Sequence, residues 1–437
     1  MYLYSALQAR EKEGNPIRVC LVGAGKFGSM FLNQIITTPG LEVTSIADLN
    51  THNAKLTCKT VGWTDDQIAT VTFTDDAVKA IQSDDSDVIV EATGHPSWGV
   101  KHAREAFKMG KHIVMVNVEA DVLAGPLLAK EATSAGVVYS MAYGDQPALT
   151  CELVEWARSC GFHVTAAGKG TKYLPKYHMS TPDTVWDHYG ITHDEAIQAG
   201  MNSKMFNSFL DGTKSALEMA AIANACNLAP PNNGLSFPPC GMNDLAQVLR
   251  PASEGGQLEF NGQVEVVSSI ERDGRAVTND LRWGVYVVLE AQNDYASKCF
   301  KEYGMNTDNS GRYSAMFKPF HLIGLELNIS IISAAIRGIP TGSTKDFCGD
   351  VVATAKRNLK VGEVLDGEGG ATVWGKLIPA ATSLSKRHLP IGLAQGITIK
   401  KPIKVGEIIG WDDVIFDPTD HVIAFRKSME SVFSRNY

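Results

Sequence analysis

A glycine-rich turn between a strand and a helix constrains the fold of this chain more than any other feature. The segment CLVGAGKFGSMF, Cys20–Phe31, begins inside the apolar run IRVCLV and leads into SMFLNQII, whose apolar residues have helical spacing. Gly23, Gly25 and Gly28 follow the pattern G-x-G-x-x-G, which lets a pyrophosphate approach the backbone at a helix N-terminus. The pattern predicts a dinucleotide site but says nothing about the substrate.

The residues after this turn supply the context that such a motif needs. The predicted strand LEVTSIAD ends in Asp48, at about the 20-residue distance at which a carboxylate accepts the ribose hydroxyls. Further predicted strands, ATVTFT, DVIVEATG, KHIVMVN and GVVYSMA, alternate with segments of helical periodicity. This alternation predicts a doubly wound parallel sheet.

The predicted cofactor contacts lie in the turn and in two later loops. ATGHP and VNVEAD each follow a strand, at the sheet edge where ligands of open α/β sheets bind, so their polar residues are candidates to line a nicotinamide. Asp48 favours NAD because a carboxylate repels a 2′-phosphate, but the neighbouring residues leave NAD or NADP open. The predicted cofactor-binding residues are Gly23, Gly25, Lys26, Phe27, Gly28, Asp48, Thr93, Gly94 and Asn117.

Length and composition limit the remaining possibilities. A chain of 437 residues predicts two or three domains, and a net charge of −8 disfavours nucleic acid and anionic membranes as partners. We find no signal peptide and no apolar run of about 20 residues, so a cytoplasmic protein is expected. The eight cysteines form no C-x-x-C pair, which predicts reduced and mostly buried thiols. The first 16 residues are expected to fray, with a short amphipathic arm as the alternative.

The middle of the chain carries lysines and acids in places that suggest chemistry. Lys169 lies between two glycines directly after an apolar strand, where its side chain would project into a cleft. The segment MNSKMFNSFLDGTKSALEMAAIANA predicts one helix that carries Lys204, Asp211, Lys214 and Glu218. An exposed ion-pair ladder is the ordinary interpretation of this spacing, and convergence on a polar substrate is the alternative.

Two further features concern the end of the chain. After Lys318, His321 precedes a largely apolar helix and is interpreted as a core histidine rather than as a substrate contact. From about Thr344 the chain is rich in glycine and short strands, and LKVGEVL and IKVGEII repeat one kernel. They predict a small β-rich module with an internal repeat, which serves as an oligomer contact or a lid. The predicted domains are 1–147, which binds the dinucleotide, 148–343, for catalysis and oligomerisation, and 344–437.

The order of these motifs resembles a known family. Val19–Gly28, VNVEAD, YGDQP and GKGTKYLP occur in the order of the homoserine dehydrogenase superfamily, and the K-V-G-E segments resemble a SAF, or antifreeze-like, module. Over nearly the whole chain the combination resembles the deoxyxylulose-phosphate reductoisomerase-like enzymes. The resemblance implies an α/β fold: a doubly wound Rossmann domain, an α+β catalytic domain and a small β-rich SAF-like domain.

The same resemblance implies an activity. Such enzymes are NADPH-dependent isomeroreductases that convert 1-deoxy-D-xylulose 5-phosphate, a small phosphorylated sugar, to 2-C-methyl-D-erythritol 4-phosphate in isoprenoid biosynthesis. It also implies inhibition by fosmidomycin and a homodimer or higher homo-oligomer, and it suggests a divalent cation, Mg or Mn, whose ligands are unknown. Glu119 and Asp145 are the candidate acid/base or metal-binding carboxylates, and Lys169, Lys204 and Lys214 are candidates to bind a phosphate or an oxyanion.

Departures from homoserine dehydrogenase argue for a different substrate. That enzyme has an aspartate and then a lysine four residues later, where this chain has Lys214 and Glu218, and Val118 stands where its loop has lysine. One alternative is an NAD(P)-dependent dehydrogenase of another small polyol, sugar acid or homoserine-like alcohol. Another is a non-catalytic dinucleotide sensor, which would have no need of the lysines and acids of the middle domain.

Overall fold

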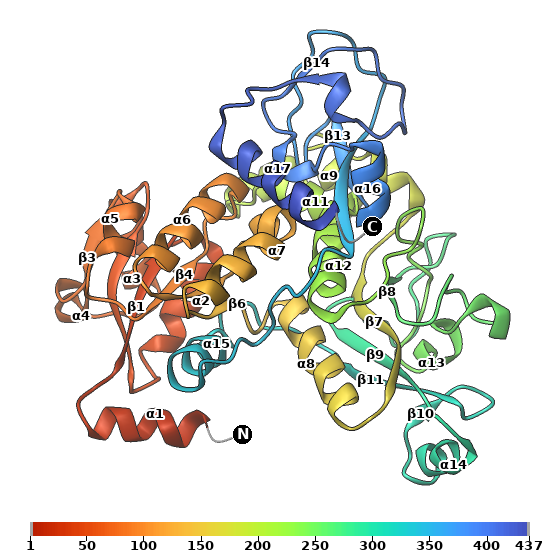
Figure 1. Cartoon of the computed structure of the whole chain (residues 1–437), viewed down its shortest axis with the longest axis horizontal. Helices are drawn as coiled ribbons and strands as arrows, with labels where there is room; N and C mark the ends of the chain where they lie inside the picture. The colour runs from red at the N-terminus through yellow and green to blue at the C-terminus, as the bar shows by residue number, and fades with distance from the viewer. Residues whose placement is uncertain (1–2, 435–437) are drawn as a thin grey trace. The chain divides into compact units, whose positions relative to one another are not determined.

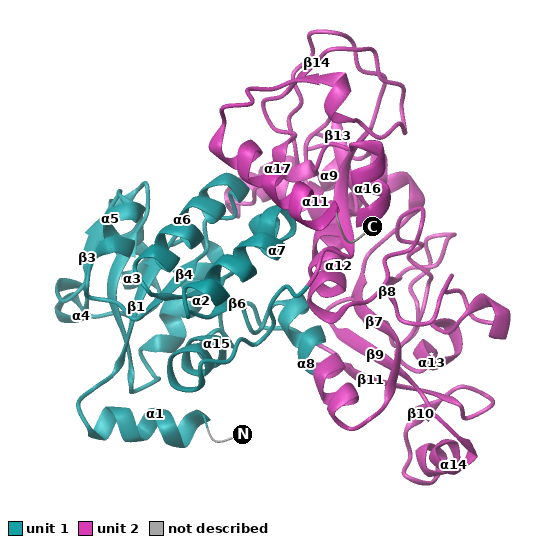
Figure 2. Cartoon of the chain, viewed as in Figure 1, with its two compact units in different colours: residues 1–152, 321–345 teal, residues 153–320, 346–437 magenta. Residues whose placement is uncertain are grey.

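The computed structural model of the chain describes residues 3–434 and divides into two compact units (Figure 2). Unit 1 comprises residues 1–152 and 321–345, and unit 2 comprises residues 153–320 and 346–437. Helix α8, Gln146–Ser159, begins in unit 1 and ends in unit 2. This division is coarser than the three predicted domains, which remain a prediction.

Unit 1 contains a six-stranded parallel sheet in the order β3-β2-β1-β4-β5-β6 (Figure 1). This is the strand order of a dinucleotide-binding Rossmann fold, which confirms the predicted doubly wound sheet. The central strands are almost wholly buried because helices cover both faces of the sheet, and their sequences are accordingly continuous apolar runs. The strands are β1 Ile17–Val22, β2 Leu41–Ala47, β3 Thr72–Thr74, β4 Val88–Glu91, β5 His112–Met115 and β6 Tyr139–Met141.

The helices of unit 1 follow their strands in the predicted alternation. Several begin with a side chain that accepts a backbone N–H, as Asn50, Asp76 and Asn117 do at the starts of α3, α5 and α7. The helices are α2 Lys26–Ile35, α3 Thr51–Thr60, α4 Asp65–Ala69, α5 Ala77–Gln82, α6 Pro96–Lys108, α7 Val118–Ser134 and α15 Asn328–Ile332, which continues as a π-helical turn, η3 Ser333–Arg337.

The N-terminal segment forms a helix that packs against unit 1 of the same chain, so the expectation that it frays was wrong. Helix α1, Leu3–Lys12, buries Leu3 and Leu7 in the core of unit 1. Leu7 packs so closely against Gly40 that a Cβ there would lie 2.8 Å from the Leu7 carbonyl oxygen. Burial of these two side chains offsets the entropy of ordering the segment.

A segment from late in the sequence completes unit 1. Residues 321–345 lie against α2, where Gly324 has φ +71° and a Cβ would lie 2.7 Å from the Phe27 carbonyl oxygen. Leu327, Ile331 and Ile332 belong to the same core as β1 and α2. His321 is half-buried in the loop that begins this segment, so the prediction of a core histidine was wrong.

Unit 2 is built on a five-stranded mixed sheet in the order β10-β11-β9-β7-β8 (Figure 1). β7 pairs parallel to β8 and antiparallel to β9. β9 is fully buried, and the first half of β11 is buried. The strands are β7 His163–Thr171, β8 Gln263–Ser268, β9 Val285–Glu290, β10 Asn306–Thr307 and β11 Tyr313–Lys318. The helices of this part are α9 Val185–Tyr189, α10 His193–Gln198, α11 Ser203–Leu210, α12 Thr213–Cys226, α13 Leu245–Val248 and α14 Asp294–Glu302, with 3-10 turns η1 Pro175–Met179 and η2 Ala252–Glu254.

The single helix predicted over residues 201–225 is two helices. α11 ends at Leu210 and α12 begins at Thr213, because Gly212 between them has φ +89°, which no helix interior accommodates. The Asp211 carboxylate also accepts a hydrogen bond from Thr213 N, which stabilises the break. The predicted ladder of exposed ion pairs was therefore wrong, since Asp211 and Glu218 are both buried.

Residues 344–437, for which the sequence predicts the β-rich module, lie within unit 2 from residue 346 on, and a separate domain there remains a prediction. The two K-V-G-E kernels adopt the same turn, with Gly362 at φ +87° and Gly406 at φ +81°. They also pair with each other, since Leu359 and Ile403 exchange two backbone hydrogen bonds. Its elements are β12 Gly349–Ala355, β13 Val373–Pro379, α16 Ala380–Lys386, η4 Ile391–Leu393, β14 Thr398–Ile399, η5 Trp411–Asp413, β15 Val414–Ile415 and α17 His421–Phe433.

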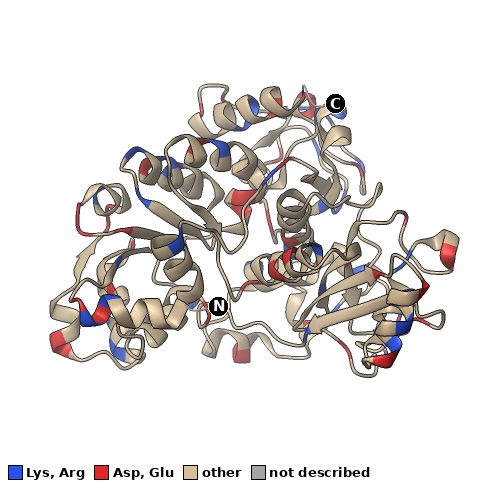
Figure 3. Cartoon of the chain, turned by 60° about the horizontal axis from the view of Figure 1, so that its bottom comes forward, with Lys and Arg blue, Asp and Glu red and all other residues tan. Residues whose placement is uncertain are grey.

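General surface properties agree with the composition. In the view of Figure 3, lysines and arginines lie among aspartates and glutamates along the ribbon. Within residues 3–434, no helix is both long enough and apolar enough to cross a bilayer. All eight cysteines are free thiols, and the buried ones are Cys20, Cys58, Cys151, Cys226 and Cys240.

Candidate functional site

The glycine turn of unit 1 has the geometry of a pyrophosphate site. Gly23 has φ +96°, and a Cβ there would lie 2.8 Å from the Ala92 carbonyl oxygen. A Cβ at Gly28 would lie 2.5 Å from the Gly23 carbonyl oxygen, so this glycine lets α2 pack on the turn. Gly25 is exposed with open space around it, directly before the N-terminus of α2. A phosphate that entered this space would meet backbone N–H groups and the positive end of the helix dipole.

Asp48 is held at the side of this turn. One carboxylate oxygen accepts Ala24 N at 2.9 Å and the other accepts Asn50 N at 2.8 Å, which fixes the side chain while leaving lone pairs for ribose hydroxyls. A cavity of about 430 Å³ opens beside it and has Lys26 as its one lysine or arginine. The cavity is lined by Ala24, Gly25, Lys26, Ser29, Asp48, Asn50, Asn53, Ala54 and Thr57.

The other predicted cofactor residues of unit 1 form a polar network at the C-terminal ends of β4 and β5. Asn117 caps α7 through Ala120 N and donates to Thr93 Oγ1 at 3.4 Å, beside the exposed Gly94. Thr93 in turn donates to the buried carboxylate of Glu91 at 2.5 Å. Phe27 contributes instead to the core packing of α2. Sequence reasoning missed Glu91, although an acid at the end of an apolar strand was a usable signal.

The predicted carboxylates Glu119 and Asp145 also lie in unit 1. Glu119 is buried in the first turn of α7, and Asp145 is half-buried before α8, where it accepts a hydrogen bond from Gln146 N. Nearby, the buried Asp121 accepts hydrogen bonds from the hydroxyls of Tyr139 and Thr344, and burial raises its pKa to about 6. Asp121 was not predicted, because its partners are distant in sequence.

A divalent cation finds no ligand set in the part of the chain that the structure describes. Across residues 3–434, no three His, Cys, Asp or Glu side chains are grouped as metal ligands. Catalysis by Mg or Mn therefore gains no support from these residues, and we assign no step to such an ion.

In unit 2, Lys169 forms a buried ion pair with Glu218. Lys169 lies near the end of β7 and Glu218 on α12, and both side chains are less than one-tenth exposed. The strand register places Lys169 opposite Val285 of β9, and Val285 opposite Lys318 of β11. Residues paired in this way share one face of a sheet, so the two lysines lie in one row. The structure thus joins Lys169 to the acid that departs from the homoserine dehydrogenase pattern.

A second buried ion pair joins the segment between α11 and α12 to the β-rich module. Asp211 Oδ2 lies 2.7 Å from Lys356 Nζ, and the ammonium also donates to the carbonyl oxygens of Ser180 and Gly370, each at 2.7 Å. Burial raises the pKa of Asp211, against the opposing effect of Lys356. Lys356 was not predicted because nothing near it in sequence marks it as buried.

The remaining predicted lysines have different surroundings. Lys204 is half-buried, and its Nζ donates to the carbonyl oxygen of Asp366 in the β-rich module. Lys214 is half-buried in the first turn of α12, the turn that precedes Glu218. Lys172, which was not predicted as a site residue, donates to the His188 carbonyl oxygen at 2.6 Å, and burial lowers its pKa.

Two segments of the chain match known protein families. Residues 17–116 match the oxidoreductase family with an NAD-binding Rossmann fold, and residues 144–327 match the family "Oxidoreductase DRL, catalytic domain". The chain is thus an NAD(P)-dependent oxidoreductase. A comparison with curated protein sequences finds no match.

Solved structures share only distant similarity with the chain. A 1-deoxy-D-xylulose 5-phosphate reductoisomerase from Zymomonas mobilis in complex with NADPH is 18% identical over 46% of this chain and 57% of its own, with a TM-score of 0.33. A scyllo-inositol dehydrogenase from Lactobacillus casei with bound NAD(H) and scyllo-inositol is 14% identical over 36% of this chain and 46% of its own, with a TM-score of 0.27. A Synechocystis biliverdin reductase with biliverdin and NADP⁺ is 18% identical over 38% of this chain and 54% of its own, with a TM-score of 0.27. The chain spans about half the length of each, and likeness at this level supports no statement about activity.

Proposed function

We propose that this oxidoreductase is an NADPH-dependent reductoisomerase that converts 1-deoxy-D-xylulose 5-phosphate to 2-C-methyl-D-erythritol 4-phosphate. The observation that carries the proposal is the buried pair Lys169–Glu218, which lies in the segment that matches an oxidoreductase catalytic domain. An acid and a cation held together away from water are the groups that a ketose rearrangement needs. The family resemblance of the motifs supplies the substrate.

Each member of the pair has a role in this scheme. Glu218 takes the proton of a substrate hydroxyl as a carbon–carbon bond migrates, and the Lys169 ammonium donates a hydrogen bond to the carbonyl oxygen on which negative charge develops. Both interactions are strengthened by burial, because the effective dielectric constant is low there. The proton held by Glu218 then passes to that oxygen, which becomes a hydroxyl. NADPH, when bound, would supply the hydride that reduces the resulting aldehyde, and this reduction takes up one further proton.

The other predicted residues have proposed roles of their own in each unit. Lys214 lies in the first turn of α12, where its charge and the helix N-terminus both favour the substrate phosphate. Gly25 and Lys26 bind the cofactor pyrophosphate, and Asp48 binds its ribose. Glu119 and Asp145 of unit 1 remain candidates for the proton that completes the aldehyde reduction. We propose further that the enzyme is a cytoplasmic homo-oligomer and that fosmidomycin, a phosphonate, competes for the phosphate position.

The test combines cofactor consumption with product identification. Purified protein is mixed with deoxyxylulose phosphate and NADPH or NADH, with and without Mg²⁺ or Mn²⁺, and the product is identified by carbon NMR. Methylerythritol phosphate as the product supports the proposal. Reduction of the ketone without rearrangement would assign a plain dehydrogenase. If the cofactor binds, but NADPH is not oxidised with this substrate and NAD(P)⁺ is not reduced with a panel of polyols and sugar acids, the reductoisomerase is excluded and the sensor interpretation is favoured.

A further inference from the structure

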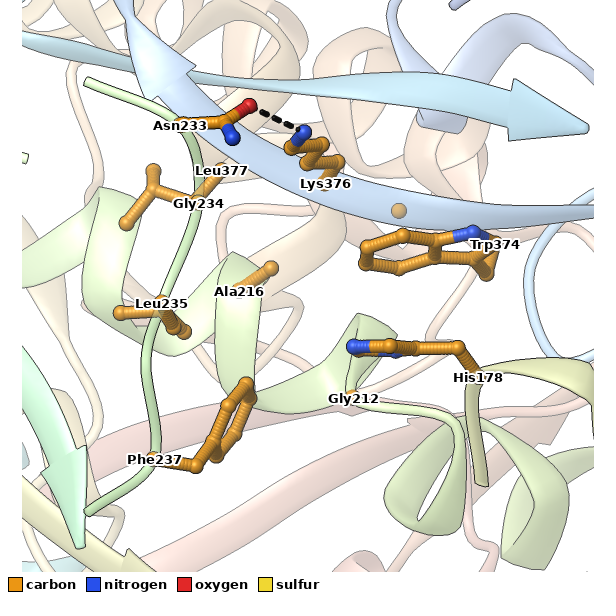
Figure 4. Close-up of a pocket in the computed structure, with 11 residues that line it drawn as sticks. His178, Gly212, Ala216, Asn233, Gly234, Leu235, Phe237, Trp374, Lys376 and Leu377 are labelled. Atoms are coloured by element: carbon orange, nitrogen blue, oxygen red, sulfur yellow. Dashed lines mark hydrogen bonds between the residues drawn. The ribbon is translucent and has the colours of Figure 1, made fainter. Parts of the chain in front are cut away.

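A small cavity in unit 2 lies apart from the Lys169–Glu218 pair. It has a volume of about 210 Å³ and lies between α12, the loop 233–237 and strand β13. Figure 4 shows Leu235, Ala216 and Phe237 on one side of it, with Trp374 and His178 stacked across from them. None of the predicted functional residues lines this cavity.

Lys376 is the only charged group in the cavity wall. Its Nζ donates to Asn233 Oδ1 at 2.6 Å, and no acidic side chain of residues 3–434 forms an ion pair with it. An ammonium has three donors, so two remain after this bond. Partial burial lowers the pKa of Lys376, which an anion at the same place would reverse. The cavity therefore favours a ligand with a negative charge.

The aromatic walls of the cavity are neutral. His178 stacks on Trp374 with 3.9 Å between the ring centroids, and Tyr173 stacks on Phe237 at the same separation. Both nitrogens of His178 have partners, the Asp211 carbonyl oxygen at 2.7 Å and the Tyr173 hydroxyl at 2.9 Å. Burial lowers the pKa of His178 to about 4, so the ring is uncharged near neutral pH. Such walls favour a planar, apolar ligand body.

The loop that carries Phe237 is held in place by two charged side chains. Phe237 has φ +51°, a conformation that costs a bulky residue free energy and persists only where the surroundings enforce it. The buried Glu265 accepts hydrogen bonds from the backbone N–H groups of Ser236 and Phe237. Arg272 donates to the carbonyl oxygens of the same two residues. The wall is thus preorganised and need not form on binding.

The cavity and the proposed catalytic pair use different sides of α12. Gly212 and Ala216 line the cavity, whereas Glu218 lies two residues further along, about 200° around the helix axis from Ala216. Glu218 there pairs with Lys169 of the sheet, while Ala216 faces the residues of β13. A ligand in the cavity would leave the Lys169–Glu218 pair untouched.

We propose that this cavity binds a small planar organic monocarboxylate, with its carboxylate on Lys376 and the Asn233 amide and its ring against Phe237, Leu235 and Ala216. The volume equals that of roughly seven water molecules, enough for a body the size of benzoate. This site is separate from the proposed substrate site, and its test requires no turnover.

Fluorine NMR titration of the full-length protein with para-fluorobenzoate tests the proposal. We expect saturable broadening of the ligand signal. The neutral isostere para-fluorobenzamide should bind about tenfold more weakly or not at all, because it cannot form the ion pair. Equal binding of the two probes, or no binding of either, overturns the proposal.

Variants locate the binding. Lys376→Met should weaken fluorobenzoate about tenfold, and Asn233→Asp, an exposed position, should do the same by pairing with the lysine. Lys404→Met removes an exposed lysine of the same module and should leave binding unchanged. Thermal unfolding shows that each variant is folded. If binding survives in both Lys376→Met and Asn233→Asp, the ligand lies elsewhere.

A competition experiment tests whether the site is separate. Deoxyxylulose phosphate should not displace fluorobenzoate from the wild-type protein. Displacement at the concentrations that saturate the catalytic site would show that the cavity is part of the substrate site, and the inference of a second site would be wrong. Because binding is measured directly, failure of the reductoisomerase activity leaves this test intact.

Discussion

Asp211 and Lys356 are 145 positions apart in the sequence and form an ion pair of 2.7 Å with both side chains almost completely buried. Asp211 directly follows α11 and begins the break before α12, and Lys356 directly follows β12. The pair therefore ties the β-rich module to α11 and α12, the second of which carries Glu218. The stability of unit 2 should therefore depend on this contact with the last ninety residues.

Removal of one partner should destabilise unit 2 strongly. Lys356→Met leaves the Asp211 carboxylate buried and unpaired, and we expect a loss of about 3–5 kcal/mol in the free energy of unfolding by urea. The double variant Asp211→Leu with Lys356→Met should recover part of this loss, because no charge remains unpaired. Lys404→Met at an exposed site is the control and should change stability by about 0.5 kcal/mol or less. A loss this small in Lys356→Met would contradict the structural role.

The pH dependence of stability should show a contribution from Asp121. Its pKa is about 6 in the folded protein against 3.8 for a free aspartate side chain, so the folded state binds a proton that the unfolded state releases between these pH values. The contribution of this group is full below about pH 4, declines as pH rises and is lost above about pH 6.

Asp121→Asn removes this titration while keeping one acceptor oxygen for Tyr139 and Thr344. The wild type should therefore lose stability relative to D121N as the pH rises from about 4 to 6, by about 3 kcal/mol at most. Urea denaturation of both proteins across this range measures the difference. A difference that is constant with pH would mean that Asp121 has an ordinary pKa.

Variants of Lys169 and Glu218 should lose catalytic activity but still bind the cofactor. Glu218→Gln removes the proposed base but keeps a hydrogen-bonding side chain, so kcat/KM should fall by about 10²–10⁴-fold. Lys169→Met should lower kcat to a similar extent, while the Kd for NADPH stays within about twofold in both variants. Lys298→Met on the exposed face of α14 serves as the control. Full activity in Glu218→Gln would remove this residue from the mechanism.

Alanine substitutions at two glycines of the turn should have different effects, one on cofactor affinity and the other on stability. Gly25→Ala places a methyl group in open space, so the melting temperature should be preserved while NADPH affinity falls about tenfold or more. Gly28→Ala forces a contact of 2.5 Å with the Gly23 carbonyl oxygen, so the protein itself should lose stability. Thermal unfolding without cofactor and NADPH fluorescence titration distinguish the two effects. Unchanged affinity in Gly25→Ala would show that the pyrophosphate does not approach this position.

The cofactor domain could be predicted because its signals are local. The strand, turn and helix around Gly23–Gly28 and the acid at Asp48 lie within one βαβ unit, and residue type and spacing in such a unit determine its geometry. The K-V-G-E kernels were predictable for the same reason, since each needs a glycine at positive φ in its own turn. In both cases the informative residues are neighbours in sequence.

The predicted helix over 201–225 shows where local patterns fail. The helical spacing of its apolar residues spans Asp211 and Gly212, but in the structure Gly212 adopts a positive φ and the buried Asp211 pairs with Lys356, so the helix is interrupted there. The predicted ladder of exposed charges along this helix is absent because each of the two acids pairs with a lysine from another element.

The sequence by itself determined the Rossmann fold of unit 1, the glycine turn with Asp48, and the internal repeat of the last ninety residues. Only the tertiary structure decided which charges are paired. The free energy of a buried carboxylate depends on whether a cation reaches it through a medium of low dielectric constant, and that cation lies on a different element. Lys169 with Glu218 and Asp211 with Lys356 are such pairs, and the chain brings them together only by folding.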